Sequence, residues 1–143
     1  EILIGLVGSE MWIRDSILLV PMDPMLIQQV ICNLLENAVR HSGDPTGIVL
    51  RLYRRDGTAV TEVADRGRGL TPEVLEAVRA GRPLSTSTSG DASRGMGIGL
   101  SVCQSIVTAH GGALEAENGP SGGAVFRFDL PLKEEEEREW TQP

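Results

Sequence analysis

Two clusters of alternating glycines constrain the fold of this chain most. The first, Asp65–Gly69, reads DRGRG, and the second, Gly95–Leu100, reads GMGIGL. Because glycine has no side chain, the backbone at such clusters can turn sharply and bring its N–H groups close to a ligand. A segment with Asn33 and Asn37 precedes both clusters. Together the segments offer amide oxygens that suit a magnesium ion, a carboxylate that suits a base, and bare N–H groups that suit phosphates.

Sequence periodicity predicts the elements that carry these segments. Ile17–Val20 is a short apolar run and is expected to be a strand. Apolar residues at helical spacing then predict a helix over Met25–His41, with Asp23 as its N-cap and Pro24 in its first turn. Ser42–Pro45 ends that helix.

The rest of the chain predicts two hairpins and two more helices. Asp56-Gly57 is a strong hairpin turn signal between two strand patterns. Residues 82–94, rich in Ser, Thr and Gly, are expected to be mobile. The predicted strands are 48–54, 58–64, 113–117 and 124–130, and the predicted helices start at Thr71 and within the second glycine cluster. Helices on one face of a mixed, mostly antiparallel sheet form an α/β (α+β) sandwich.

Composition bounds the domain and its partners. A chain of 143 residues with 41% hydrophobic and 3% aromatic content suits one domain with an aliphatic core. A net charge of −7 argues against binding to nucleic acid. No apolar run is long enough to span a membrane, so no membrane contact by this fragment is expected. Residues 1–16 are interpreted as a linker or foreign segment, 17–132 as the domain and 133–143 as an acidic tail. Cys32 and Cys103 are expected to be small buried residues.

Asn33, Asn37 and His41 are spaced i, i+4 and i+8, so they line one stripe of the first predicted helix. Neutral amide oxygens suit magnesium, which keeps several waters and bridges to phosphates. The alternative is that these polar residues fill a solvated helix face. Arg40, one turn from Asn37, is a candidate phosphate contact, as is Arg94 beside the second glycine cluster.

The two glycine clusters suggest two further contacts. The Asp65 carboxylate can accept a hydrogen bond from the exocyclic amine of adenine, which favours adenine over guanine. Gly95, Gly97 and Gly99 can direct successive N–H groups at an anion where the next helix begins. The alternatives are an ordinary turn at Asp65 and a flexible joint without a ligand at the second cluster. His110, before Gly111-Gly112, is interpreted as a helix C-terminal cap.

With these residues in place, the sequence resembles the ATP-binding domain of sensor histidine kinases in the GHKL ATPase superfamily. Residues 29–41 resemble the N box, 65–69 the G1 box, 95–100 the G2 box, and 110–131 the end of the domain. The similarity covers about residues 18–132 and is greatest to the potassium-responsive KdpD type.

The resemblance implies a Bergerat fold with ATP and Mg²⁺ as cofactors. Asn37 would bind the metal, Asn33 would be a second metal or phosphate contact, and Glu36 matches an acidic position sometimes proposed as a catalytic base. The residues that the resemblance assigns to ATP are Asn33, Asn37, Arg40, His41, Asp65, Gly67, Gly69, Leu70, Arg94, Gly95, Met96, Gly97, Ile98, Gly99 and Leu100.

The resemblance also implies partners. The domain would supply the γ-phosphate to a histidine on a separate dimerisation hairpin, upstream in the parent protein, and the phosphate would pass to a response regulator. The parent would be anchored in a membrane with this domain in the cytoplasm. Residues 74–80 and the loop after them lack the phenylalanine of the family's F box. His41 and His110 lie inside the ATP motifs, so the chain alone is not expected to phosphorylate itself. The alternatives are an anti-sigma-type serine kinase and a non-catalytic nucleotide-binding interaction module.

Overall fold

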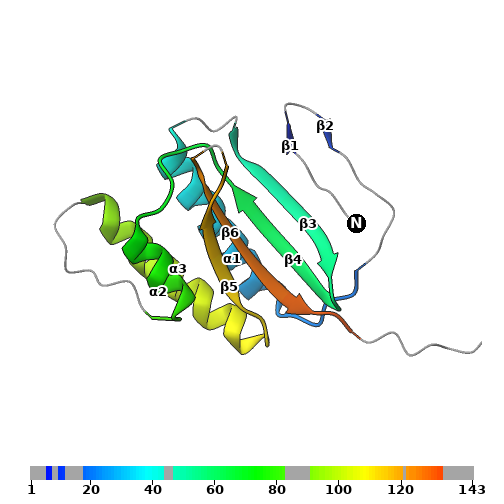
Figure 1. Ribbon diagram of the computed structural model, residues 1–143. Coiled ribbons are helices and arrows are strands. Elements are labelled where there is room, and N and C mark those ends of the chain that lie inside the picture. The colour runs from blue at the N-terminus through cyan, green and yellow to red at the C-terminus, as the bar shows by residue number, and fades with distance from the viewer. Residues whose placement is uncertain are drawn as a thin grey trace, which may run out of the picture.

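The computed structural model describes residues 6–7, 10–11, 18–43, 47–82, 91–120 and 122–133, and for 6–7, 10–11 and 91–98 it describes the backbone alone. Figure 1 shows the arrangement of the elements. In chain order they are β1 (Leu6–Val7), β2 (Glu10–Met11), α1 (Pro24–Ser42), β3 (Val49–Arg55), β4 (Thr58–Ala64), α2 (Pro72–Arg79), α3 (Asp91–Ala109), β5 (Leu114–Asn118) and β6 (Ala124–Pro131).

The main sheet has four antiparallel strands in the order β3-β4-β6-β5, and β1 pairs with β2 apart from it. One face of the sheet packs against the helices (Figure 1). Phe126 and Phe128 of β6 lie on that face and pack with Val30 and Leu34 of α1 and Val107 of α3. The expected helices over one face of an antiparallel sheet, around a largely aliphatic core, are therefore confirmed.

Helix α1 begins and ends where its sequence predicts. The Asp23 side chain accepts hydrogen bonds from the backbone N–H groups of Met25 at 3.0 Å and Leu26 at 3.3 Å. These bonds satisfy N–H groups that a helix N-terminus otherwise leaves unpaired. Gly43 ends the helix in the left-handed conformation with φ of 66°.

His110 ties the end of α3 to the beginning of α1. Its Nε2 accepts a hydrogen bond from Asp23 N at 3.1 Å, so Nδ1 carries the proton and donates to Ile106 O at 2.7 Å. The second contact confirms the expected role of His110 at the helix C-terminus. The first links the two helices and has no counterpart in the sequence pattern.

The β3–β4 hairpin also forms as predicted. Asp56 and Gly57 both have positive φ, 46° and 76°, which is the geometry that Asp-Gly sequences adopt between antiparallel strands. The turn fixes the register Arg51↔Glu62, and β4 then delivers Asp65 at its end.

The opposite face of the sheet carries a row of charges across all four strands. Arg51, Glu62, Arg127 and Glu115 lie side by side from β3 to β5. Glu62 is buried, yet it is compensated, because Arg127 Nε lies 3.3 Å and Tyr53 Oη 3.3 Å from its Oε2. Burial first, and then the charge of Glu62, raise the pKa of Tyr53.

The strand predicted at Ile17–Val20 is wrong in its described part. Residues 18–20 have no strand partner within the described chain, and Leu19 O accepts one backbone hydrogen bond, from Lys133 N at 3.0 Å. A short apolar run matches the strand pattern but does not specify which strand it would pair with. Here the Leu19 contact is the one backbone hydrogen bond that residues 18–20 make within the described chain.

The expected burial is confirmed for Cys103 and wrong for Cys32, which is exposed. Cys32 is two residues from both Val30 and Leu34, and two residues are about 200° around a helix, so it faces away from the core. Within the described helices, none combines the length and the apolar character that membrane crossing requires.

Helix α3 begins earlier than predicted. It starts at Asp91, so the glycines at which it was expected to begin lie inside it. Of the stretch expected to be mobile, residues 83–90 lie outside the described residues. Each glycine costs about 1 kcal/mol in a helix interior, but the apolar spacing of Leu100, Cys103 and Val107 anchors the later turns in the core.

We expect Gly112→Ala to destabilise the fold by roughly 2–4 kcal/mol, because a Cβ there would lie 1.7 Å from Asp129 O and push β5 from β6. Urea unfolding measures the change. Gly81→Ala is the matched control. Gly81 has φ of 65° and open space around its Cβ position, so only the left-handed backbone cost of about 1–2 kcal/mol remains. Equal losses in the two variants would contradict the steric account.

Candidate functional site

The polar stripe predicted on α1 is present. Asn33, Asn37 and His41 are half-buried, whereas the core stripe of α1 is buried. The Cys103 thiol of α3 donates to Val30 O at 3.8 Å, and burial, offset in part by the nearby Asn33 side chain, raises the pKa of Cys103 to about 11. Asn33 therefore contacts a core helix, and Asn37 lies one turn nearer the glycine loop that follows β4.

Asp65 is fixed by the backbone around it. Its N–H donates to Ala124 O at 2.9 Å, and its Oδ1 accepts from Gly67 N at 2.8 Å and from Ala124 N at 3.2 Å. Both side-chain contacts fall on the same oxygen. Among the described residues none hydrogen-bonds the second oxygen, Oδ2, which can therefore accept a hydrogen bond from a ligand. A carboxylate held in this way is suited to recognise an amine.

Gly67 brings the Asp65 loop against the C-terminal end of α1. A Cβ at Gly67 would lie 2.3 Å from His41 O and 2.8 Å from Ser42 Cα. Real Cβ atoms essentially never approach so closely, so only glycine allows this contact. The structure thus places the carboxylate-bearing loop against the end of α1 that carries His41.

Three residues that the sequence analysis did not assign to the site hold the other side of the loop. Asn118 Oδ1 accepts from Leu70 N at 2.7 Å and its Nδ2 donates to Leu70 O at 3.1 Å. A Cβ at Gly123 would lie 1.8 Å from Asp65 O. Gly69 has φ of 77°, and a Cβ there would lie 2.6 Å from Gly122 O. The sequence from Asn118 to Gly123 is typical of a turn. Its three glycines are the one signal in it that indicates close backbone contacts.

His41 is electrostatically unusual. Its Nε2 is buried and has no hydrogen-bond partner among the described residues. Burial foremost, and then the positive charges of Arg68 and Arg40, lower the pKa of His41 below 6.5, while Asp65 opposes them. The ring is therefore neutral at pH 7. Arg68, a residue of the loop itself, is a further positive charge near His41 that no sequence motif marks.

The remaining predicted residues are placed unevenly. Glu36 and Arg40 are exposed on α1, and Leu70 and Leu100 are buried in the core. The side chains of Arg94, Met96 and Ile98 lie outside the described residues.

The expected loop at Gly95, Gly97 and Gly99 is wrong for this structure, because those residues lie inside α3. Their N–H groups belong to the helical ladder and do not converge on one point.

The comparisons agree with this geometry. The family of histidine kinase-, DNA gyrase B-, and HSP90-like ATPases matches residues 22–134. The sensor protein KdpD of Clostridium acetobutylicum is 40% identical over 119 residues, which are 83% of this chain and 13% of that protein. The adaptive-response sensory kinase SasA of Parasynechococcus marenigrum is 36% identical over 121 residues, 84% of this chain and 31% of that protein.

A solved structure extends the likeness to the fold. The catalytic domain of the histidine kinase ThkA has a TM-score of 0.63 and 30% identity, over 78% of this chain and 70% of that one. The chain spans less than a third of the length of the two curated relatives, KdpD and SasA. With its antiparallel sheet, its helical layer and its fixed carboxylate loop, this chain belongs to the family of histidine kinase-, DNA gyrase B-, and HSP90-like ATPases.

Proposed function

We propose that this chain is the catalytic, ATP-binding domain of a two-component sensor histidine kinase. It binds ATP and supplies the γ-phosphate to a histidine on a separate dimerisation hairpin, from which a response regulator takes it. Two observations carry the proposal. The Asp65 carboxylate is held on Oδ1 by two backbone N–H groups, and the buried Nε2 of His41 has no hydrogen-bond partner among the described residues. The parent protein is membrane-anchored and this domain lies in the cytoplasm.

Asp65 and His41 recognise the nucleoside. Asp65 Oδ2 accepts from the adenine amine, and the neutral His41 ring offers a buried nitrogen to the base or ribose. Burying such a nitrogen without a partner costs free energy, so a ligand that supplies one is favoured. Gly67 and Gly69 keep the loop free of side chains next to the base.

Positive charge and the α3 terminus hold the phosphates. Arg40, together with Arg68, gives the loop a positive potential. The N–H groups of Gly95, Gly97 and Gly99 can reach a phosphate only if the first turns of α3 unwind. Glycine lowers helix stability by about 1 kcal/mol per residue, which keeps that change small in free energy. Arg94 and Leu100 flank this segment, and Met96 and Ile98 stand between its glycines.

The described residues fit Mg²⁺ bound together with phosphates. They contain no cluster of three acidic, histidine or cysteine ligands, but Asn37 offers a neutral amide oxygen, and magnesium takes its other ligands from water and phosphate. When bound, the ion would neutralise charge on the β- and γ-phosphates. Asn33, which contacts Cys103, is the second ligand candidate, and Glu36 is the candidate base.

Neither histidine of this chain suits the role of phosphoacceptor. Both ring nitrogens of His110 are hydrogen-bonded, and the proposal places the His41 ring against the nucleoside. The test is incubation with γ-labelled ATP, with and without the parent's histidine hairpin added as a separate protein. We expect acid-labile label on the hairpin alone. Acid-stable label on a serine would favour the anti-sigma-type kinase, and ATP binding without transfer would favour the interaction module.

Asp65→Asn should weaken ATP binding roughly tenfold to a hundredfold, because a hydrogen bond to a charged group contributes about 1.5–3 kcal/mol. Asparagine keeps an oxygen for Gly67 N and Ala124 N and replaces Oδ2 by a donor, so the fold is preserved and the adenine contact is lost. Calorimetric titration with ATP and GTP measures the affinity and the base preference.

Asp56→Asn makes the same charge change in the exposed β3–β4 turn and should leave both affinities unaltered. Equal binding of ATP and GTP by the unmodified chain would remove the case for Asp65.

Asn37→Ala should abolish the dependence of ATP affinity on Mg²⁺, so that the ratio of the Kd values without and with the ion falls to about one. The fold should survive, because Asn37 is only half-buried and alanine favours a helix. Gln29→Ala, exposed two turns earlier on α1, is the control. An unchanged magnesium dependence in Asn37→Ala would exclude the metal role.

A further inference from the structure

The last pair of residues in the β5–β6 ladder holds both ends of the loop that carries Asp65. Asn118 of β5 lies opposite Ala124 of β6. Ala124 O accepts from Asp65 N at 2.9 Å, and Ala124 N donates to Asp65 Oδ1 at 3.2 Å. Asn118 bonds the N–H of Leu70 at 2.7 Å and its C=O at 3.1 Å. One rung of the sheet therefore closes the loop at its first and at its last residue.

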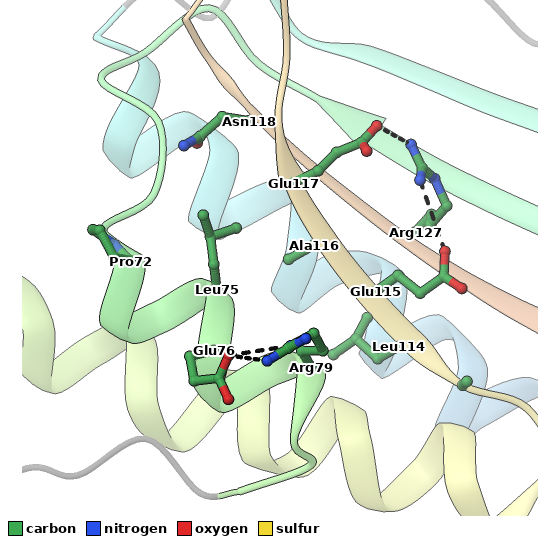
Figure 2. Close-up of a pocket in the computed structure, with 11 residues that line it drawn as sticks. Pro72, Leu75, Glu76, Arg79, Leu114, Glu115, Ala116, Glu117, Asn118 and Arg127 are labelled. Carbon is green, nitrogen blue, oxygen red and sulfur yellow. Dashed lines mark hydrogen bonds and ion pairs between the residues drawn. The ribbon is translucent and has the colours of Figure 1, made fainter.

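Asn118 reaches the loop from outside the candidate site. It stands at the end of β5, and its side chain is directed at the segment that leads into α2 at Pro72 (Figure 2). It also lines a groove of about 780 Å³ between α2 and β5, and none of the residues assigned to ATP lines that groove. Asn118 can therefore act on a nucleotide only through the loop.

A side-chain amide suits the end of this loop. It carries an acceptor and a donor side by side, so it can pair with both backbone groups of one residue, as a neighbouring strand would. Leu70 is buried and comes directly before Thr71, the N-cap of α2. Asn118 thus fixes the point at which the loop passes into the core and into α2.

Gly69 leaves the room that Asn118 needs. Its φ is 77°, and a Cβ there would lie 2.7 Å from Asn118 Oδ1. Real Cβ atoms essentially never approach so closely, so a larger residue at position 69 would displace the amide from Leu70. The need for glycine at position 69 therefore has a cause within the protein, apart from any contact with a base.

We propose that Asn118 is a positioning residue for base recognition, which acts through the loop on the Asp65 carboxylate. The inference rests on the proposed function. Without the Asn118 amide the loop is closed at Asp65 alone, and its glycines give the free end many conformations. Gly67 N can then leave Asp65 Oδ1, and the carboxylate is no longer held in one orientation. Discrimination between the amine of adenine and the carbonyl of guanine requires that fixed orientation.

The first test is calorimetric titration of Asn118→Ala with ATP and with GTP. We expect the affinity for ATP to fall roughly fivefold to tenfold and the preference for ATP over GTP to fall with it. The fold should survive, because Asn118 is exposed. Glu117→Ala is the matched control, since Glu117 is the neighbouring residue of β5 but pairs with Arg127, and it should keep both affinities.

A double variant separates positioning from a general loss of stability. In the Asp65→Asn background, Asn118→Ala should weaken ATP binding by less than about twofold, because both changes act on the same contact. A purely structural role for Asn118 would give the full loss again in that background and leave the ratio of ATP to GTP affinity unchanged, and either result would overturn the inference.

Hydrogen exchange in the nucleotide-free chain, followed by NMR, tests the inference independently of the proposed function. Asn118→Ala should speed exchange at the Gly67 amide roughly tenfold and leave that of Val63 in β4 unchanged. Unchanged exchange at Gly67, or an equal increase at Val63, would refute the role of Asn118. If the unmodified chain binds ATP and GTP equally, the proposed function fails instead. If it prefers ATP and Asn118→Ala keeps that preference, this inference alone fails.

Discussion

The contact between the Asp65–Leu70 loop and the end of α1 is the constraint on which the site depends. The loop is held from three directions: by the His41 carbonyl against Gly67, by the Asn118 side chain on Leu70, and by Gly123 against the Asp65 carbonyl. Two of these contacts are so close that a Cβ would clash, so Gly67 and Gly123 must be glycine. Together they fix one carboxylate oxygen and leave the other for a ligand.

Much of this could be predicted from local sequence, because the signals act over a few residues. Asp23 and Pro24 define the start of α1, Asp56-Gly57 defines the hairpin, and the spacing of Asn37 and His41 defines a polar stripe. The contacts that could not be predicted from the sequence join residues far apart in the chain. Asn118 reaches Leu70 across 48 positions, and His110 reaches Asp23 across 87, and no periodicity records either.

The misplaced start of α3 has a different origin. Alternating glycines predict a loop from intrinsic propensity, but propensity is a weak term, and the packing of Cys103 and Val107 anchors a helix that extends back to Asp91. The same residues that are costly in a helix would give little resistance to unwinding. The predicted burial of Cys32 is wrong because an apolar residue in a helix is buried only if its angle around the helix axis faces the core, and Cys32 faces away.

The proposed recognition of adenine depends on one oxygen, Asp65 Oδ2. A structure of the chain with a non-hydrolysable ATP analogue and Mg²⁺ tests it most directly. The account predicts that the adenine amine lies about 2.7–3.2 Å from that oxygen, with the base beside Gly67 and the His41 ring. A base bound away from Asp65, for example in the groove between α2 and β5, would contradict it.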